Sequence, residues 1–279
     1  KDFPFIIGHW TSYNSSQTME EEWEDYSKTN PYYRPFGVVD SDKTYGKDFT
    51  LQKMFPKLPT FKNPNNTKQS IYSTTDERGE WAFEYGQEYV PLNIIPGQQI
   101  IGYFFDKRYW HKHRDTILSY LSFSDNYIKE ASKDIQENIK NKKTVSLNLR
   151  FQDKRFIGDM VEGDLLHEHL EKEEWIKRAI NYYPSDYVFV VTSNNMDKGR
   201  EYLNKILPER EFVFLDGNPG EQMAVCSSCD GHIITNSTFS FWCAYLDKKQ
   251  PNTKTVYSSK YKIRHTEHQI PYKEWYELT

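Results

Sequence analysis

The carboxyl-terminal half of the chain alternates short apolar runs with amphipathic segments. The apolar runs are rich in β-branched and aromatic residues, which is typical of buried strands, and they cover residues 144–149, 187–193, 212–215, 232–237 and 255–257. The segments between them carry apolar residues at helical spacing, and they cover residues 169–183, 195–207, 221–229 and 239–246. Short strands that alternate with helices predict an α/β fold with a parallel, doubly wound sheet.

The amino-terminal half is less regular, and prolines interrupt its aromatic-rich beginning. Further along, the pattern predicts a strand at residues 99–104, a helix through residues 117–121 and a charged helix at residues 124–139. The charged helix ends in a run of lysines and an asparagine. We therefore place a domain boundary there, between residues 1–140 and 141–279.

Polar residues follow the predicted strands of the second half. In a doubly wound sheet the ligand lies in the crevice beyond the carboxyl ends of the strands. The polar or charged positions that follow a strand are Arg150 with Asp153, residues 193–195, residues 216–218, and Ser237 with Thr238. We expect these positions to meet in one crevice although they are distant in the sequence.

Residues 233–246 carry the strongest local signal. A buried strand stops at Thr235, and an amphipathic helix begins almost at once. The start of a helix presents unpaired backbone N–H groups and a positive dipole end, and Ser237 and Thr238 add two hydroxyl groups. This arrangement predicts an anion site. The alternative is that Ser237 or Thr238 only caps the helix.

Composition and charge narrow the class of ligand. The chain has 279 residues and a formal net charge of -4, so it has no positive field that would hold a nucleic acid or an anionic membrane. Aromatic residues make up 16% of the chain, and their amphipathic rings suit sugar faces and polar-lined clefts. No apolar run approaches the roughly 18 residues of a membrane span, and the beginning lacks the pattern of a signal peptide. We expect small-molecule partners, no nucleic acid and no transmembrane segment.

The three cysteines indicate whether the protein belongs to an oxidising or a reducing compartment of the cell. Cys226, Cys229 and Cys243 are an odd number, which argues against a disulfide framework and for a reducing compartment. The first two have CxxC spacing but lack the second pair of ligands that a structural zinc needs. We expect core cysteines, no metal site and a cytoplasmic protein of a microbe or a virus. The Golgi lumen is the alternative if an amino-terminal anchor is missing from this chain.

Several segments together resemble a known family. They are IIGYFFDKRYW at residues 100–110, VSLNLRFQDK at 145–154, VFVVTSNNMDKGREYL at 188–203, MAVCSSCDGHIITNSTFSFWCAYLDKK at 223–249 and IPYKEWYEL at 270–278. In order and spacing they resemble the α-1,2-fucosyltransferases of glycosyltransferase family 11, which are related to the α-1,6- and protein O-fucosyltransferases. The resemblance covers about residues 98–279, and the segment at 223–249 is the most specific.

The resemblance implies a GT-B fold, in which two Rossmann-like domains face a cleft. Residues 1–140 would form the acceptor-side domain and residues 141–279 the domain that binds the nucleotide sugar. The implied reaction is inverting transfer of fucose from GDP-fucose to a hydroxyl of a glycan acceptor, through an α-1,2 linkage. It needs no metal and no cofactor besides the donor substrate.

The resemblance also assigns roles to residues. Arg150 would stabilise the diphosphate, Asp153 is the candidate base, and Glu221 would accept from the N–H edge of guanine. The full set of expected donor-binding residues is Asn148, Arg150, Ser193, Asn194, Glu221, Asn236, Ser237, Thr238 and Phe239. Two of these roles have ordinary alternatives, since Glu221 also suits the first turn of any helix and Arg150 could form a structural ion pair.

The chain departs from the family pattern at several places. Asn148, Phe151 and Gln152 stand where the family has His, a second Arg and Gly, and residues 194–195 replace an acidic pair. The family's Gly-rich loop is absent, so we expect that roughly the first 20 to 30 residues of the natural protein are missing from this chain. These departures leave two alternatives open: a degenerate, non-catalytic protein that binds glycans or nucleotides, and the same fold acting on GDP-rhamnose or GDP-mannose.

Overall fold

The computed structural model of the protein describes seven parts of the chain. They are residues 55–57, 69–70, 99–100, 107–151, 174–235, 237–258 and 270–279. All structural statements refer to these residues. Of residues 69–70 and 99–100, the backbone alone is described, as the short parallel pair β1 (Gln69–Ser70) and β2 (Gln99–Ile100).

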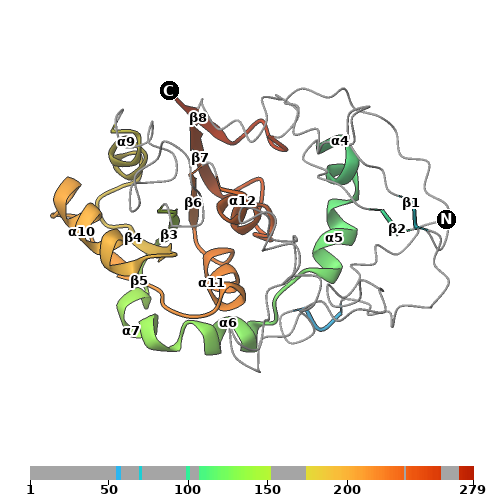
Figure 1. Ribbon diagram of the computed structural model, residues 1–279, viewed down its shortest axis with the longest axis horizontal. Helices are drawn as coiled ribbons and strands as arrows, with labels where there is room; N and C mark the ends of the chain where they lie inside the picture. The colour runs from blue at the N-terminus through green and yellow to red at the C-terminus, as the bar shows by residue number, and fades with distance from the viewer. Residues whose placement is uncertain are drawn as a thin grey trace, which may run out of the picture.

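A sheet of six parallel strands organises the second half of the chain (Figure 1). Its strands are β3 (Thr144–Leu149), β4 (Val188–Ser193), β5 (Phe212–Phe214), β6 (Gly231–Ile234), β7 (Lys254–Ser258) and β8 (Tyr276–Leu278). The spatial order is β5-β4-β3-β6-β7-β8, so the chain first winds outward from β3 and then returns to start again at β6. The predicted α/β class with a doubly wound sheet is confirmed, and its switch point lies between β3 and β6.

Helices cover both faces of this sheet. One face carries α9 (Trp175–Asn181) and α10 (Met196–Ile206), and the other carries α11 (Pro219–Cys226) and α12 (Thr238–Tyr245) (Figure 1). On the first face, Ile176 and Leu203 pack against Leu147 in the largest apolar cluster. On the second face, Val225 and Cys243 pack against the other sides of the central strands. Alternate residues of a strand point to opposite faces of the sheet. The central strands therefore supply apolar side chains to both faces.

The predicted helices of the second half are confirmed, with differences at their ends. Asn195 caps α10 by accepting from the Lys198 N–H at 3.1 Å, and Ser237 caps α12. The helix predicted at residues 169–183 is described from Trp175 onward, and its earlier part lies outside the described residues. The strand β8 was not predicted; the indole of Trp175 donates to the Leu278 carbonyl at 2.9 Å and holds this strand at the edge of the sheet.

The charged helix predicted at residues 124–139 is wrong as a continuous element. It divides into α6 (Asp125–Ala131), a 3-10 turn η2 (Lys133–Ile135) and α7 (Gln136–Ile139). The break falls at Ser132, whose hydroxyl donates to the Lys129 carbonyl at 3.2 Å and so competes with the helical backbone. The break turns Ile135 into the apolar cluster that contains Val188. Tertiary packing has outweighed local helical periodicity here.

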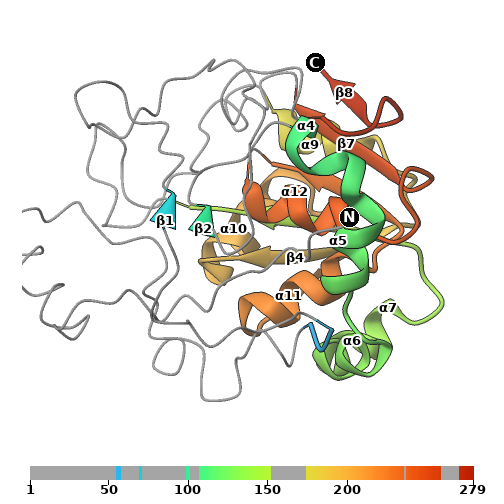
Figure 2. The ribbon, with the colours of Figure 1, turned by 90° about the vertical axis from the view of Figure 1, so that its right-hand side faces the viewer.

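The helices α4 (Lys107–Trp110), η1 (His111–His113) and α5 (Arg114–Tyr120) pack against the outer side of α12 (Figure 2). Trp110 lies edge-on to Tyr245 with ring centroids 4.8 Å apart, and Arg114 donates to the Asp247 carbonyl at 2.9 Å. Most of the predicted first domain, residues 1–140, lies outside the described residues. The second Rossmann-like domain of the expected GT-B arrangement would be formed by this part of the chain, so the structure does not test it. Residues 101–104 of the predicted first strand also lie outside the described residues.

The three cysteines are free and buried, as predicted. Among the described residues, no helix is both long and apolar enough to cross a membrane.

Candidate functional site

The switch point brings two strand ends together. β3 ends at Leu149 and is followed directly by Arg150, which is half-buried. β6 ends at Ile234, and the next residue, Thr235, donates its hydroxyl to the carbonyl of Asn148 at 2.6 Å. This hydrogen bond joins the strand end that carries Arg150 to the turn that begins α12.

The turn before α12 is held by a second group of hydrogen bonds. Ser240 donates its hydroxyl to the Ser237 carbonyl at 2.9 Å and accepts from the Thr235 N–H at 3.2 Å. Ser237 caps the helix, because its hydroxyl oxygen accepts from the Phe239 N–H at 3.2 Å. The turn is therefore fixed before any ligand arrives.

The electrostatics of this junction favour an anion. The positive end of the α12 dipole lies just beyond the carboxyl end of β6, where Thr238 is exposed. Arg150 adds a guanidinium at the neighbouring strand end, which suits a phosphate by its planar set of donors. The two interpretations of Ser237, as part of an anion site and as a helix cap, are compatible, since a residue that caps a helix can also border an anion site.

The neighbouring strand end, after β4, is bound to the protein itself. The Asn194 side chain accepts from the Phe151 N–H at 2.8 Å and donates to the Phe151 carbonyl at 3.0 Å. The hydroxyl of Ser193 is likewise engaged with the backbone of Asn195 at 3.0 Å. These two expected donor-binding residues lie beside the switch point, and their side chains hold the segment that follows Arg150 in place.

Asn148, at the position of the family's histidine, also bonds within the sheet. Its amide donates to the Thr192 hydroxyl at 3.0 Å, across to β4. The side chain of Phe239 packs into the apolar cluster under α11 and α12, so its N–H and not its ring faces the turn.

Glu221 lies in the first turn of α11, as expected. Its carboxylate accepts from the Asn218 N–H at 3.0 Å, while its own N–H donates to the Asn218 side chain at 3.0 Å, which is a capping box. One carboxylate oxygen, Oε1, has no hydrogen bond within the described residues. Burial, and secondarily the charge of Glu221, raises the pKa of Tyr127 to about 12. Asp153 and Asn236 lie outside the described residues.

Two residues that hold the site were missed at the level of sequence, Thr235 and Ser240. Both are buried, at 4% exposure each; the Thr235 hydroxyl bonds to the end of β3 and the Ser240 hydroxyl to the turn. The hydroxyl-bearing residues between Thr235 and Ser240 were the signal in the sequence that could have pointed to them. The sequence did not show which groups these hydroxyls would bond. Among the described residues, no group of three or more His, Cys, Asp or Glu side chains could hold a metal.

A second polar cluster lies in the interior of the molecule. Ser146, His232 and Asp247 form a chain of hydrogen bonds of 2.8 Å and 3.2 Å through the two ring nitrogens of His232. The imidazole is 0% exposed and Asp247 is 1% exposed, so no substrate reaches this chain. Its residue types match a catalytic triad, but its burial assigns it a structural role.

The combination of a doubly wound sheet with a polar helix start and an arginine at its switch point defines a class: α/β proteins that bind nucleotides or other phosphate compounds at the carboxyl ends of their strands. Comparison with known families makes the class specific. The chain belongs to glycosyl transferase family 11, whose family profile matches residues 87–279. The resemblance read from the sequence is thereby confirmed.

Individual relatives agree with this family. The chain is 28% identical over 213 residues to galactoside alpha-(1,2)-fucosyltransferase 2 of Mus musculus, covering 69% of this chain and 57% of that protein. It is 29% identical over 153 residues to alpha-1,2-colitosyltransferase of Escherichia coli, covering 53% of this chain and 51% of that protein. The chain therefore spans little more than half the length of these relatives.

Among solved structures, POFUT1 in complex with GDP is similar over 52% of this chain and 49% of that chain. The TM-score is 0.37 and the sequence identity is 16%.

Proposed function

We propose that the protein transfers fucose from GDP-fucose to a hydroxyl group of a glycan acceptor, through an α-1,2 linkage and with inversion at the anomeric carbon. The proposal draws on the family and on the relatives named as α-(1,2)-fucosyltransferases. The structural observation that supports it is the Thr235–Asn148 hydrogen bond at 2.6 Å, because it joins the end of β3, which precedes Arg150, to the turn before α12.

In the proposed reaction, the bond between the sugar C1 and the diphosphate oxygen breaks as the acceptor oxygen bonds to C1. Negative charge then grows on the departing GDP. Arg150 and the N–H groups at the start of α12 would stabilise that charge, and fixed donors of this kind need no reorganisation during the reaction. Asp153 is the proposed base for the acceptor hydroxyl proton.

The proposed donor site extends from the diphosphate to the guanine. Within the part of the chain that the structure describes, one carboxylate oxygen of Glu221 has no hydrogen bond, and guanine presents two N–H donors that suit a carboxylate. The α11 helix lies beside α12 on the same face of the sheet, so one nucleotide could contact the first turns of both helices (Figure 1).

A second candidate is transfer of another sugar by the same fold. One relative favours this candidate: the Escherichia coli protein is named as a colitosyltransferase, that is, for a sugar other than fucose. A degenerate, non-catalytic binding protein is the third candidate. It is motivated by Asn148 and Asn194, whose side chains bond within the protein where the family pattern has other residues.

A panel of nucleotide sugars tests these candidates together. The natural full-length protein would be incubated with GDP-fucose, GDP-mannose, GDP-rhamnose and UDP-sugars, with lactose as a galactoside acceptor, while GDP release and product are measured. We expect transfer from GDP-fucose. Transfer from a different GDP-sugar alone would select the second candidate, and GDP binding without any transfer would select the third.

The same assay addresses metal dependence. Because Arg150 and the α12 start are proposed to supply the positive charge, we expect the rate to stay within about twofold after EDTA treatment and gel filtration. Loss of activity that manganese or magnesium restores would contradict the proposed metal-independent mechanism.

A further inference from the structure

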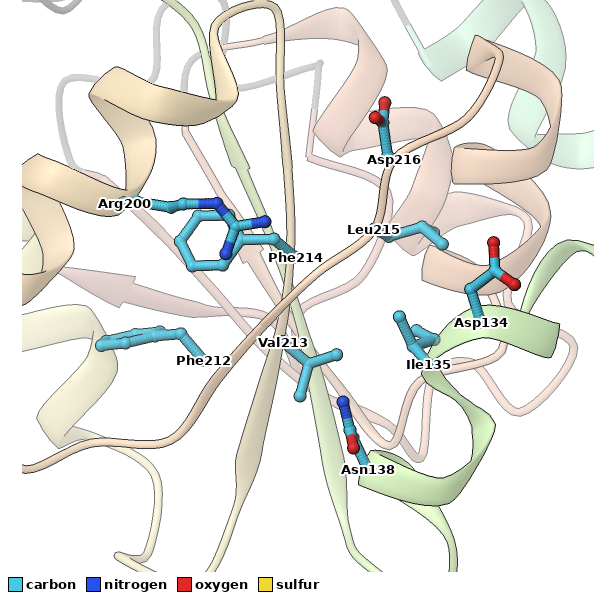
Figure 3. Close-up of a pocket in the computed structure, with 9 residues that line it drawn as sticks. All are labelled: Asp134, Ile135, Asn138, Arg200, Phe212, Val213, Phe214, Leu215 and Asp216. Atoms are coloured by element: carbon cyan, nitrogen blue, oxygen red, sulfur yellow. The ribbon is translucent and has the colours of Figure 1, made fainter.

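A surface cavity of about 270 Å³ lies along the free edge of the sheet. It straddles β5, with Phe212 and Phe214 on the side of α10 and residues of η2 and α7 on the other side (Figure 3). β5 is two strands from β3, which at about 4.8 Å per strand places it roughly 10 Å from the strand that leads to Arg150. The cavity belongs to the same sheet as the proposed donor site but opens at its edge.

The floor of the cavity is backbone without a neighbouring strand. Leu215 donates its N–H to the Val191 carbonyl at 2.9 Å, so the alternation of a parallel ladder turns the peptide groups of Phe212 and Phe214 away from β4. β5 ends the strand order, and in the described part of the chain no strand pairs with its outer side. Donors and acceptors of the main chain therefore face the cavity.

The walls carry charged side chains that form no salt bridge within the described residues. Arg200 lies over the ring of Phe214 with 4.2 Å between the guanidinium carbon and the ring centroid. On the other side of β5, Asp134 and the amide of Asn138 border the cavity, and Asp216 closes its upper end (Figure 3). Asp216 accepts from the Gly217 N–H at 2.9 Å and retains its second oxygen.

The charged side chains and main-chain groups around the cavity favour some classes of ligand over others. Two carboxylates against one guanidinium disfavour a phosphate compound, and the charged walls disfavour a purely apolar ligand. A sugar ring carries adjacent hydroxyl groups that both donate and accept, together with apolar C–H faces. Carboxylates, an amide, a guanidinium and main-chain groups can pair with such hydroxyls, while the half-buried Phe212 offers an apolar surface.

The size of the cavity agrees with one sugar unit. Its volume is just below the roughly 300 Å³ at which pockets for drug-sized ligands begin. An extended peptide would need a longer edge, because the three residues of β5 span only about 10 Å.

We propose that the cavity at the β5 edge binds a sugar residue of the glycan acceptor, away from the point of transfer. That the ligand belongs to the acceptor rests on the proposed function; that it is a sugar rests on the cavity. A contact of this kind would make the enzyme prefer acceptors long enough to reach from the transfer site to the edge of the sheet.

The experiment follows lactose binding by NMR, in the natural full-length protein, through the amide signals of Phe212 and Phe214. The double variant Arg200→Met/Asp134→Asn removes one positive and one negative wall charge and leaves the net charge unchanged. Its matched control, Lys205→Met/Glu137→Gln, makes the same change on exposed positions of α10 and α7 that do not line the cavity. We expect lactose to shift both amide signals, with affinity at least about tenfold weaker in the double variant and unchanged in the control.

Three outcomes would overturn the inference: no shift of these signals, equal affinity in the double variant, or displacement of lactose by saturating GDP, which would make the cavity part of the donor site. Because the readout requires no transfer, its failure is distinguishable from failure of the proposed function. An inactive protein that still binds lactose at Phe212 and Phe214 would retain the sugar site alone.

Discussion

At the scale of single residues, Arg150 concentrates the charge of the proposed site. It is half-buried, directly after β3, beside the segment that Asn194 anchors through Phe151. A lysine there would keep the charge but not the planar pair of donors that fits a diphosphate. We predict that Arg150→Lys lowers kcat/KM for GDP-fucose at least about tenfold, which corresponds to about 1.4 kcal/mol of lost transition-state stabilisation.

Steady-state kinetics of the folded variant provide the measurement, with Arg178→Lys as a matched control. Arg178 is exposed on α9 and donates to the carbonyl of Thr279, far from the switch point. Unchanged kcat/KM in Arg150→Lys would remove Arg150 from the proposed mechanism.

Glu221 allows its charge to be separated from its structural role. Glutamine also completes a capping box, so Glu221→Gln should leave α11 folded. In that box the amide oxygen accepts from the Asn218 N–H, so the amide turns a clashing donor toward the guanine N–H groups, and an unpaired buried donor costs about 1 to 3 kcal/mol. We predict that GDP affinity falls roughly 5- to 150-fold.

Titration calorimetry with GDP and UDP measures this change. UDP lacks the guanine edge, so its weak binding should be the same in both proteins. Equal GDP affinity would exclude Glu221 from the donor site and leave it as a helix cap.

At the scale of elements, the turn between β6 and α12 is fixed by Thr235 and Ser240. Thr235→Val keeps the shape of the side chain but leaves the Asn148 carbonyl without the hydroxyl that now lies 2.6 Å away. Leaving such a buried acceptor unpaired costs about 1 to 3 kcal/mol. We predict a loss of that size in the free energy of unfolding, and a higher KM for the donor because the start of α12 moves relative to Arg150.

Thr235→Ser retains the hydroxyl and should restore the donor KM of the wild type, although it loses a buried methyl group. Urea unfolding and donor kinetics on the three proteins provide the data. If the valine variant loses stability while its donor KM stays unchanged, the hydrogen bond supports the fold without positioning the site.

At the scale of the whole molecule, the buried chain from Ser146 through His232 to Asp247 joins β3, β6 and the end of α12. Burial lowers the pKa of His232, although hydrogen bonding to Asp247 opposes this shift. Burial alone would raise the pKa of Asp247, but hydrogen bonds from His232, Thr253 and the Lys249 N–H hold it below its ordinary value. A neutral His232 that accepts from Ser146 and donates to Asp247 satisfies every partner.

This network predicts a loss of stability on acidification. Below its ordinary pKa of 6.5, His232 takes up a proton in the unfolded chain that the folded protein binds only at a lower pH. The free energy of unfolding should therefore fall as the pH decreases from 6.5 to the folded pKa of His232. Asp247 should add a further loss below pH 3.8, as the pH passes toward its lowered pKa.

Urea unfolding at a series of pH values between about 7.5 and 5.5 measures the first part. The variant His232→Gln should be less stable at every pH but should show a flatter dependence, since glutamine does not titrate. An equal slope in the wild type and the variant would assign the pH dependence to other groups, such as His111, whose pKa is also lowered by burial, with Arg114 and Lys107 contributing.

The sequence by itself determined the strands and helices of the second half and the identity of the family. Buried strands and amphipathic helices leave a periodic record among near neighbours, so β3, β4 and α10 were predicted within a few residues. The hydroxyl-rich turn before α12 was likewise visible, because helix starts have local chemical requirements.

Only the tertiary structure decided which of these residues act together. The bond between Thr235 and Asn148 joins positions 87 residues apart, and the two bonds between Asn194 and Phe151 join positions 43 apart. The break of the helix at Ser132 has the same origin, since Ile135 turns toward strands far along the chain. Periodicity records which face of an element is buried, whereas hydrogen-bond partners depend on strand order and register, which neighbouring residues do not encode.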